Sequence, residues 1–178
     1  MKQIRWCVIF VVVLIMGILT TGKNVFALNE EWYMDYVYRL EPKSDDVDEN
    51  YIVLQEYTKS VKSLYVPATA IIDGVTYHTK LETTGNDGMW YITCDTLQEI
   101  TFEKGCKVAD GRFLFCGLSK LEKVNVEALD MSQATSTAWM FSNCKNLTKL
   151  NVADWDLSNV TNMFNMFGGC EKLSDINV

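Results

Sequence analysis

The stretch WMFSNCKNLTKLNV (residues 139–152) returns as NMFGGCEKLSDINV (165–178), and this repetition decides the fold. Every matching position in the two copies is separated by 26 residues. A third copy, FLFCGLSKLEKVNV (113–126), lies 26 residues upstream, and LQEITF (97–102) is a weaker fourth copy at a slightly shorter spacing. A fixed period between roughly 20 and 50 residues is typical of a solenoid.

Each copy contains the pattern apolar–x–x–apolar–x–apolar, and its last three positions alternate as in a strand. The Met–Phe pair upstream of this pattern and the cysteine that follows the pair suit a second, irregular or short helical segment. A single coil cannot bury its apolar face, whereas stacked coils can, because their strands pair in parallel about 4.8 Å apart. We therefore expect a leucine ladder and a phenylalanine ladder, both buried: Leu121, Leu147 and Leu173, and Phe115, Phe141 and Phe167.

The pattern MFxxCxxLxxLxV, followed by WDLSNVTNMFNMF, resembles the repeat of the BspA-like leucine-rich-repeat surface proteins of bacteria. Residues 155–167 match that repeat closely, and residues 129–141 form a degraded copy. Residues 57–81 resemble the segment that precedes the repeats in the same family. The resemblance implies a non-catalytic, cell-surface or secreted bacterial protein that binds other proteins, by adhesion to host or neighbouring cells through the sheet of its repeats.

The sequence predicts three parts: a signal peptide (1–27), a β-rich capping region (28–96) and a leucine-rich-repeat-like solenoid of parallel β coils (97–178). Lys2 and Arg5 precede an apolar run at 6–19, which is shorter than the roughly 20 residues of a spanning helix. An uncleaved membrane anchor is the alternative. The last copy ends on an apolar strand position without a polar capping unit, so we expect further sequence beyond Val178.

The capping region is predicted to form β hairpins over the open end of the solenoid. Strand-forming residues gather at 32–40, 51–57 and 64–66. Asp73–Gly74 lies between β-branched residues and predicts a type I′ turn, which needs positive φ at both positions. Asn86–Asp87–Gly88 predicts another turn.

The net negative charge of the chain limits the classes of molecule that it can bind. The chain has a formal net charge of −7, and none of its 23 acidic residues precedes Leu28. An acidic chain is a poor partner for nucleic acid and for anionic membrane surfaces. We therefore expect protein partners, no nucleic acid, and membrane association only through the signal segment or a missing anchor.

Residues able to carry chemistry are few, and no cofactor or metal site is expected. The single histidine, His78, cannot build a catalytic triad or a histidine metal site alone. The acidic loop of Asp45, Asp46, Asp48 and Asn50 lacks the glycine and glutamate of a calcium-binding loop. The chain is predicted not to be an enzyme.

The cysteines outside the signal segment are odd in number and contain no CxxC pair, which disfavours a metal site. Cys144 and Cys170 occupy the same place in successive coils, within disulfide distance. A ladder of buried thiols is favoured, because the repeat itself explains the residue type. A disulfide between Cys94 and Cys106 is a further alternative, and Cys116 completes the set.

Outward strand positions are the best candidates for a binding site, because solenoid sheets offer extended surfaces to partners. A solvated sheet face without a partner is the simpler alternative. Two other functions are considered: targeting repeats of a surface enzyme whose catalytic domain lies beyond residue 178, and a structural stalk. The candidate ligand-binding residues are Lys123, Asn125, Lys149, Asn151, Asp175 and Asn177.

Overall fold

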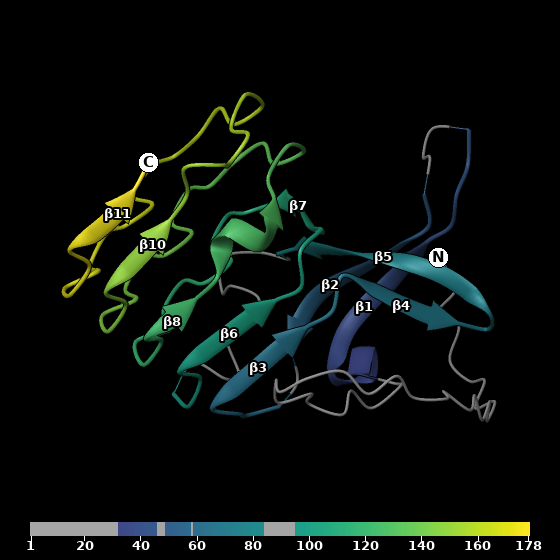
Figure 1. The fold of residues 1–178 in the computed structure, drawn as a ribbon, viewed down its shortest axis with the longest axis horizontal. Coiled ribbons are helices and arrows are strands. Elements are labelled where there is room, and N and C mark those ends of the chain that lie inside the picture. Colours follow the sequence, from purple (N-terminus) through teal and green to yellow (C-terminus); the bar gives the residue numbers. More distant parts are fainter. Residues whose placement is uncertain (1–31, 46–48, 58, 84–94) are drawn as a thin grey trace, which may run out of the picture.

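The computed structural model describes residues 32–45, 49–57, 59–83 and 95–178. The described chain is built from short strands and turns (Figure 1). Its elements are η1 (Trp32–Asp35), β1 (Tyr36–Glu41), β2 (Tyr51–Tyr57), β3 (Ser63–Val66), β4 (Thr69–Ile72), β5 (Val75–Glu82), β6 (Glu99–Phe102), β7 (Cys106–Asp110), β8 (Lys123–Val124), η3 (Val126–Ala128), β9 (Leu129–Asp130), β10 (Lys149–Asn151) and β11 (Asp175–Asn177).

A six-stranded sheet holds the N-terminal region, in the order β1-β2-β5-β7-β9, with β4 paired to β5. The β1–β2 and β4–β5 pairs are antiparallel, as expected for hairpins. Asp73 (φ 51°) and Gly74 (φ 78°) both have the positive φ of the predicted turn between β4 and β5. The pairs β2–β5, β5–β7 and β7–β9 are instead parallel, so this region is more than a set of hairpins.

The start of the N-terminal region differs from the sequence prediction. Trp32 begins a 3₁₀ helix, not a strand, and the first strand starts only at Tyr36. The predicted signal segment (1–27), the turn at 86–88 and Cys94 lie outside the described residues. Within the described part of the chain, no helix is long and apolar enough to cross a membrane.

The repeats form a parallel solenoid, as predicted (Figure 1). Lys149 pairs with Asp175, 26 residues later, and Glu99 pairs with Lys123, which confirms the shorter spacing of the first copy. β3 adds a further parallel strand beside β6, with Ser63 opposite Glu99. The region predicted as a cap therefore contributes a strand to the solenoid sheet and covers the edge of β6.

A second ladder joins the coils on their other side, where the sequence predicted only irregular or helical structure. The amide of Phe115 donates to the carbonyl of Met140 (2.8 Å), and the amide of Phe141 donates to the carbonyl of Met166 (2.9 Å). These bonds satisfy backbone groups that a loop would leave to solvent. We call the segments that carry them the return segments: residues 111–117, 136–143 and 162–168.

The core lies between the strands and the return segments. Phe115 and Phe141 are fully buried with ring centroids 5.0 Å apart, and the ring of Phe167 follows 5.7 Å from that of Phe141. Leu121 and Leu147 are likewise fully buried. The ring contacts confirm the phenylalanine ladder, and the burial of Leu121 and Leu147 agrees with the predicted leucine ladder. Their members in the last coil, Leu173 and Phe167, are only half-buried.

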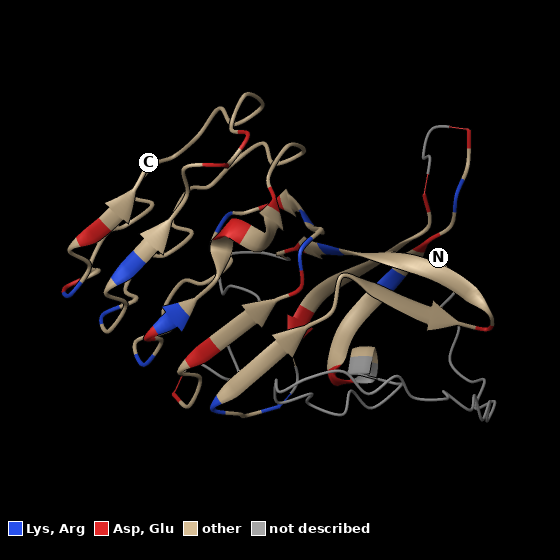
Figure 2. Cartoon of the chain, viewed as in Figure 1, with Lys and Arg blue, Asp and Glu red and all other residues tan. Residues whose placement is uncertain are grey.

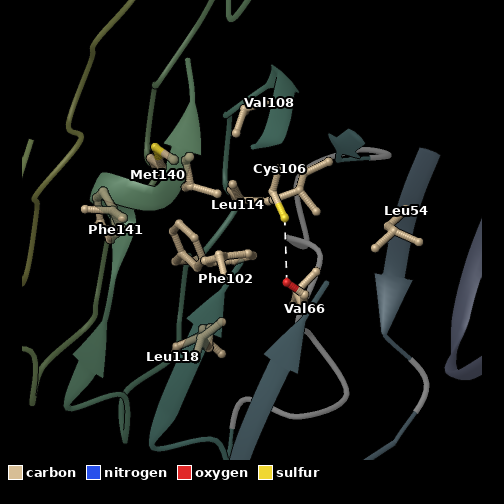
Figure 3. Packing of buried hydrophobic residues seen from close by; sticks show 14 of the residues in the cluster. Leu54, Val66, Phe102, Cys106, Val108, Leu114, Leu118, Met140 and Phe141 are labelled. Atoms are coloured by element: carbon tan, nitrogen blue, oxygen red, sulfur yellow. Dashed lines mark hydrogen bonds between the residues drawn. The ribbon is translucent and has the colours of Figure 1, made fainter. Parts of the chain in front are cut away.

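One core connects the six-stranded sheet with the strands of the solenoid (Figure 3). Cys106 lies between Leu54 of β2 and Phe102 of β6, and its thiol approaches the carbonyl oxygens of Val66 (3.6 Å) and Pro67 (3.5 Å). Burial raises the pKa of this thiol to about 12. Cys106 is therefore a neutral packing residue and not a reactive nucleophile.

Candidate functional site

The outward side of the solenoid sheet gathers charge in a single row across its strands. Strand register places Ser63, Glu99 and Lys123 side by side on β3, β6 and β8, and Lys149 beside Asp175 on β10 and β11. Figure 2 shows the pattern: acidic colour on β6 and β11, and basic colour on β8 and β10 between them. We call the exposed side of β3, β6, β8, β10 and β11 the sheet face.

Lys149 and Asp175 form an exposed ion pair, with Nζ 2.9 Å from Oδ2. The hydrogen bond from Lys149 to the Asp175 carboxylate raises the pKa of Lys149. Lys123, also exposed, forms no ion pair within the described part of the chain. The sheet face thus presents one neutralised lysine and one lysine with its charge unpaired.

Three asparagines at equivalent positions of successive coils, Asn125, Asn151 and Asn177, hold neighbouring coils together. Asn125 Oδ1 accepts from the amide of Phe102 (2.7 Å), and Asn125 Nδ2 donates to the Phe102 carbonyl (2.8 Å). Asn177 Nδ2 donates to Asn151 Oδ1 (3.0 Å). Asn125 and Asn151 are half-buried and Asn177 is exposed. Because Asn125 already uses both ends of its amide, its contacts favour a structural role.

Replacing Asn125 with alanine is expected to destabilise the chain by roughly 1–3 kcal/mol, because both backbone groups of Phe102 lose their partner. Urea denaturation followed by circular dichroism measures the change. Lys123→Ala, two residues away on the exposed face, is the matched control and should change stability by less than about 0.5 kcal/mol. Equal urea midpoints for the two variants would contradict the structural role of Asn125.

The solenoid sheet is interrupted between β8 and β10, which sequence periodicity did not predict. β8 ends a three-stranded sheet and β10 begins a two-stranded one. Val126, in η3 directly after β8, accepts a hydrogen bond on its carbonyl from the indole Nε1 of Trp155 (2.9 Å). This buried side-chain bond links the coils where the backbone ladder is missing.

Cysteines of the repeats are buried or half-buried free thiols, as the ladder interpretation predicted. Cys144 Sγ donates to the carbonyl of Phe115 (3.1 Å), and Cys170 Sγ donates to the carbonyl of Phe141 (3.0 Å). Burial raises the pKa of both thiols. Each cysteine therefore fills a small site and satisfies a carbonyl of the preceding coil.

A network of ion pairs covers part of the six-stranded sheet, and sequence reasoning missed it. Arg39 Nη2 lies 2.7 Å from Glu41 Oε1 and 2.6 Å from Glu82 Oε2, and Lys80 Nζ lies 2.8 Å from Glu41 Oε2. Burial opposes ionisation of Glu41, but hydrogen bonds from Lys80 and Arg39 lower its pKa on balance. These charges neutralise one another, so the network fits a stabilising role better than a binding role.

Of the two candidates for metal or acid–base chemistry, only His78 lies wholly within the described residues. His78 is half-buried on β5, with its ring centroid 6.4 Å from that of Tyr51. Of the acidic loop, Asp46 and Asp48 lie outside the described residues. Among the residues that the structure describes, no group of three histidine, cysteine, aspartate or glutamate side chains could hold a metal ion.

Comparison with known proteins places the repeats in a family. A family model described as "Mycoplasma protein of unknown function, DUF285" matches residues 88–177. A search of curated proteins finds no match. The chain is similar to "Crystal structure of T. pallidum Leucine Rich Repeat protein (TpLRR)", at 14% identity and a TM-score of 0.43, over 81% of this chain and 79% of that chain. The parallel coils described above define the fold of this chain.

Proposed function

This chain belongs to the DUF285 family of Mycoplasma proteins of unknown function, and we propose that it is a non-catalytic protein that recognises other proteins through its sheet face. The observation that carries the proposal is the exposed row of charged side chains on neighbouring parallel strands. Strands fixed by a continuous core hold such side chains in a constant arrangement, which suits recognition.

Lys123, Lys149 and Asp175 are the residues proposed to contact the partner first. All three are exposed, and their charges are spaced by the strand register. Asn177, exposed at the same level as Asn151, adds hydrogen-bonding groups to the edge of this surface. Electrostatic complementarity on such a surface gives partner choice and association rate more than affinity.

We propose a bacterial cell-surface or secreted location and a role in adhesion to host or neighbouring cells. Support comes from the signal-like segment at 1–27 and from the resemblance of residues 155–167 to the BspA-like repeat.

The test is saturable binding of the purified protein to cells, with and without protease treatment of the cell surface. Lys123→Glu combined with Lys149→Glu should reduce binding by at least about tenfold, since reversed charges repel the partner group they formerly attracted. Protease treatment of the cells should remove the binding sites, because the proposed partners are proteins.

Lys43→Glu combined with Lys104→Glu is the matched control, with the same charge change at exposed positions outside the strands of the sheet face. This control variant should bind as the parent does. Binding that survives both protease treatment and the Lys123/Lys149 reversal would show that the sheet face recognises no protein partner.

A further inference from the structure

The return segments of the last coils carry no charge. Residues 131–144 and 157–170 contain no aspartate, glutamate, lysine, arginine or histidine, in a chain that is 22% charged. Hydroxyl and amide side chains fill these stretches instead. The last two return segments are therefore free of charged side chains, whereas the first carries the exposed Arg112, whose charge is paired with Asp110 (2.6 Å).

Aromatic rings run along the return segments. The ring of Phe113 lies parallel to that of Trp139, with centroids 6.1 Å apart, and the ring of Phe164 follows at 5.4 Å. Phe113 and Trp139 are half-buried, while Phe164 is 65% exposed. We call these three residues the aromatic column.

The backbone conformation of two residues in the aromatic column is unfavourable for their residue type, so folding stability does not explain why they are aromatic. Phe113 (φ 55°) and Trp139 (φ 60°) have the left-handed conformation, which bulky residues rarely adopt. The equivalent position in the next coil holds Asn165 (φ 53°), a residue type that tolerates this conformation. Strained residues of this kind concentrate at functional sites.

We propose that the aromatic column and the neutral surface around it form the contact between two copies of this chain. The formal net charge of −7 makes two copies repel through most pairs of surfaces, and this side is free of that repulsion. Interface cores are poor in charged residues and rich in aromatic residues and methionine. A twofold axis would set Phe164 and the exposed Met163 against the same residues of the second copy.

Pairing through the return segments leaves both sheet faces open, because strands and return segments form separate sides of each coil. Two sheet faces in one particle would bind a cell surface with avidity beyond that of one face. This consequence rests on the proposed function, whereas the pairing itself does not.

Sedimentation equilibrium of the full chain over a range of micromolar concentrations tests the pairing. The parent should show a concentration-dependent dimer. Phe164→Asp should raise the dissociation constant at least about tenfold, because pairing would bury an unpaired carboxylate. Thr148→Asp, the same charge change on the exposed sheet face, should leave the dimer intact.

Trp139→Asn separates folding from association, because asparagine suits the backbone and removes the ring. This variant should melt cooperatively and remain monomeric. A parent that stays monomeric at every concentration, a dimer unaffected by Phe164→Asp, or an unfolded Trp139→Asn would each overturn the proposal. A monomer that loses cell binding on Phe164→Asp would assign the column to a different partner and also overturn it. Cell binding of the Lys123/Lys149 variant is measured in a separate experiment, and its outcome tests the proposed function and not the pairing.

Discussion

Leu147→Asp is expected to unfold the repeats. Leu147 is fully buried in the core cluster that also contains Leu121 and against which Leu173 packs. A carboxylate at this position would have no cationic partner, and burial of an isolated charge costs far more than a small domain can offset. Even Leu147→Ala should destabilise by roughly 2–5 kcal/mol, through lost transfer free energy and the cavity left behind.

Thermal unfolding followed by circular dichroism measures this effect. Thr148→Asp is the matched control, since it introduces the same charge one residue along, at an exposed position. Its melting temperature should lie within a few degrees of the parent value. If the Leu147→Asp protein had the same melting temperature as the parent, Leu147 would not be part of the buried ladder.

Phe141→Ala should also cause a large loss of stability, roughly 3–5 kcal/mol. Its ring is fully buried between those of Phe115 and Phe167, with centroid distances of 5.0 Å and 5.7 Å. The substitution therefore removes these two ring contacts and a third with Trp155 (6.5 Å), and it opens a cavity between coils.

Urea denaturation compares Phe141→Ala with Phe164→Ala, where the same atoms are removed from a ring that is 65% exposed. The second variant should lose no more than about 1 kcal/mol under conditions where the chain is monomeric. Similar losses in the two variants would mean that the phenylalanine ladder does not form the core.

The solenoid could be predicted because each coil repeats the same local pattern. Leu121 and Leu147 match at a fixed spacing, so one assignment of inward and outward positions serves both coils. The turn at Asp73–Gly74 could also be predicted from the sequence, because it depends on two adjacent residues that tolerate a left-handed backbone.

Features that depend on distant or non-repeating contacts could not be predicted. β3 pairs with β6 across 36 residues without any sequence period to indicate the partner. The return segments look like loops because their backbone bonds reach the next coil and leave no mark on side-chain periodicity. The outward pattern placed Asn125 correctly near the sheet face, but could not reveal that its amide is bonded to Phe102.

The most direct test of the 26-residue register is a disulfide between coils. Lys149 and Asp175 are direct partners on parallel strands, so cysteines at both positions should have α carbons within the roughly 4.4–6.8 Å that a disulfide requires. Lys149→Cys combined with Asp175→Cys should oxidise to an intramolecular bond, identified by peptide mass spectrometry. Lys149→Cys combined with Asn177→Cys, displaced by two residues along the strand, should not. Bonding in the displaced pair, or in neither pair, would contradict the parallel register of the coils.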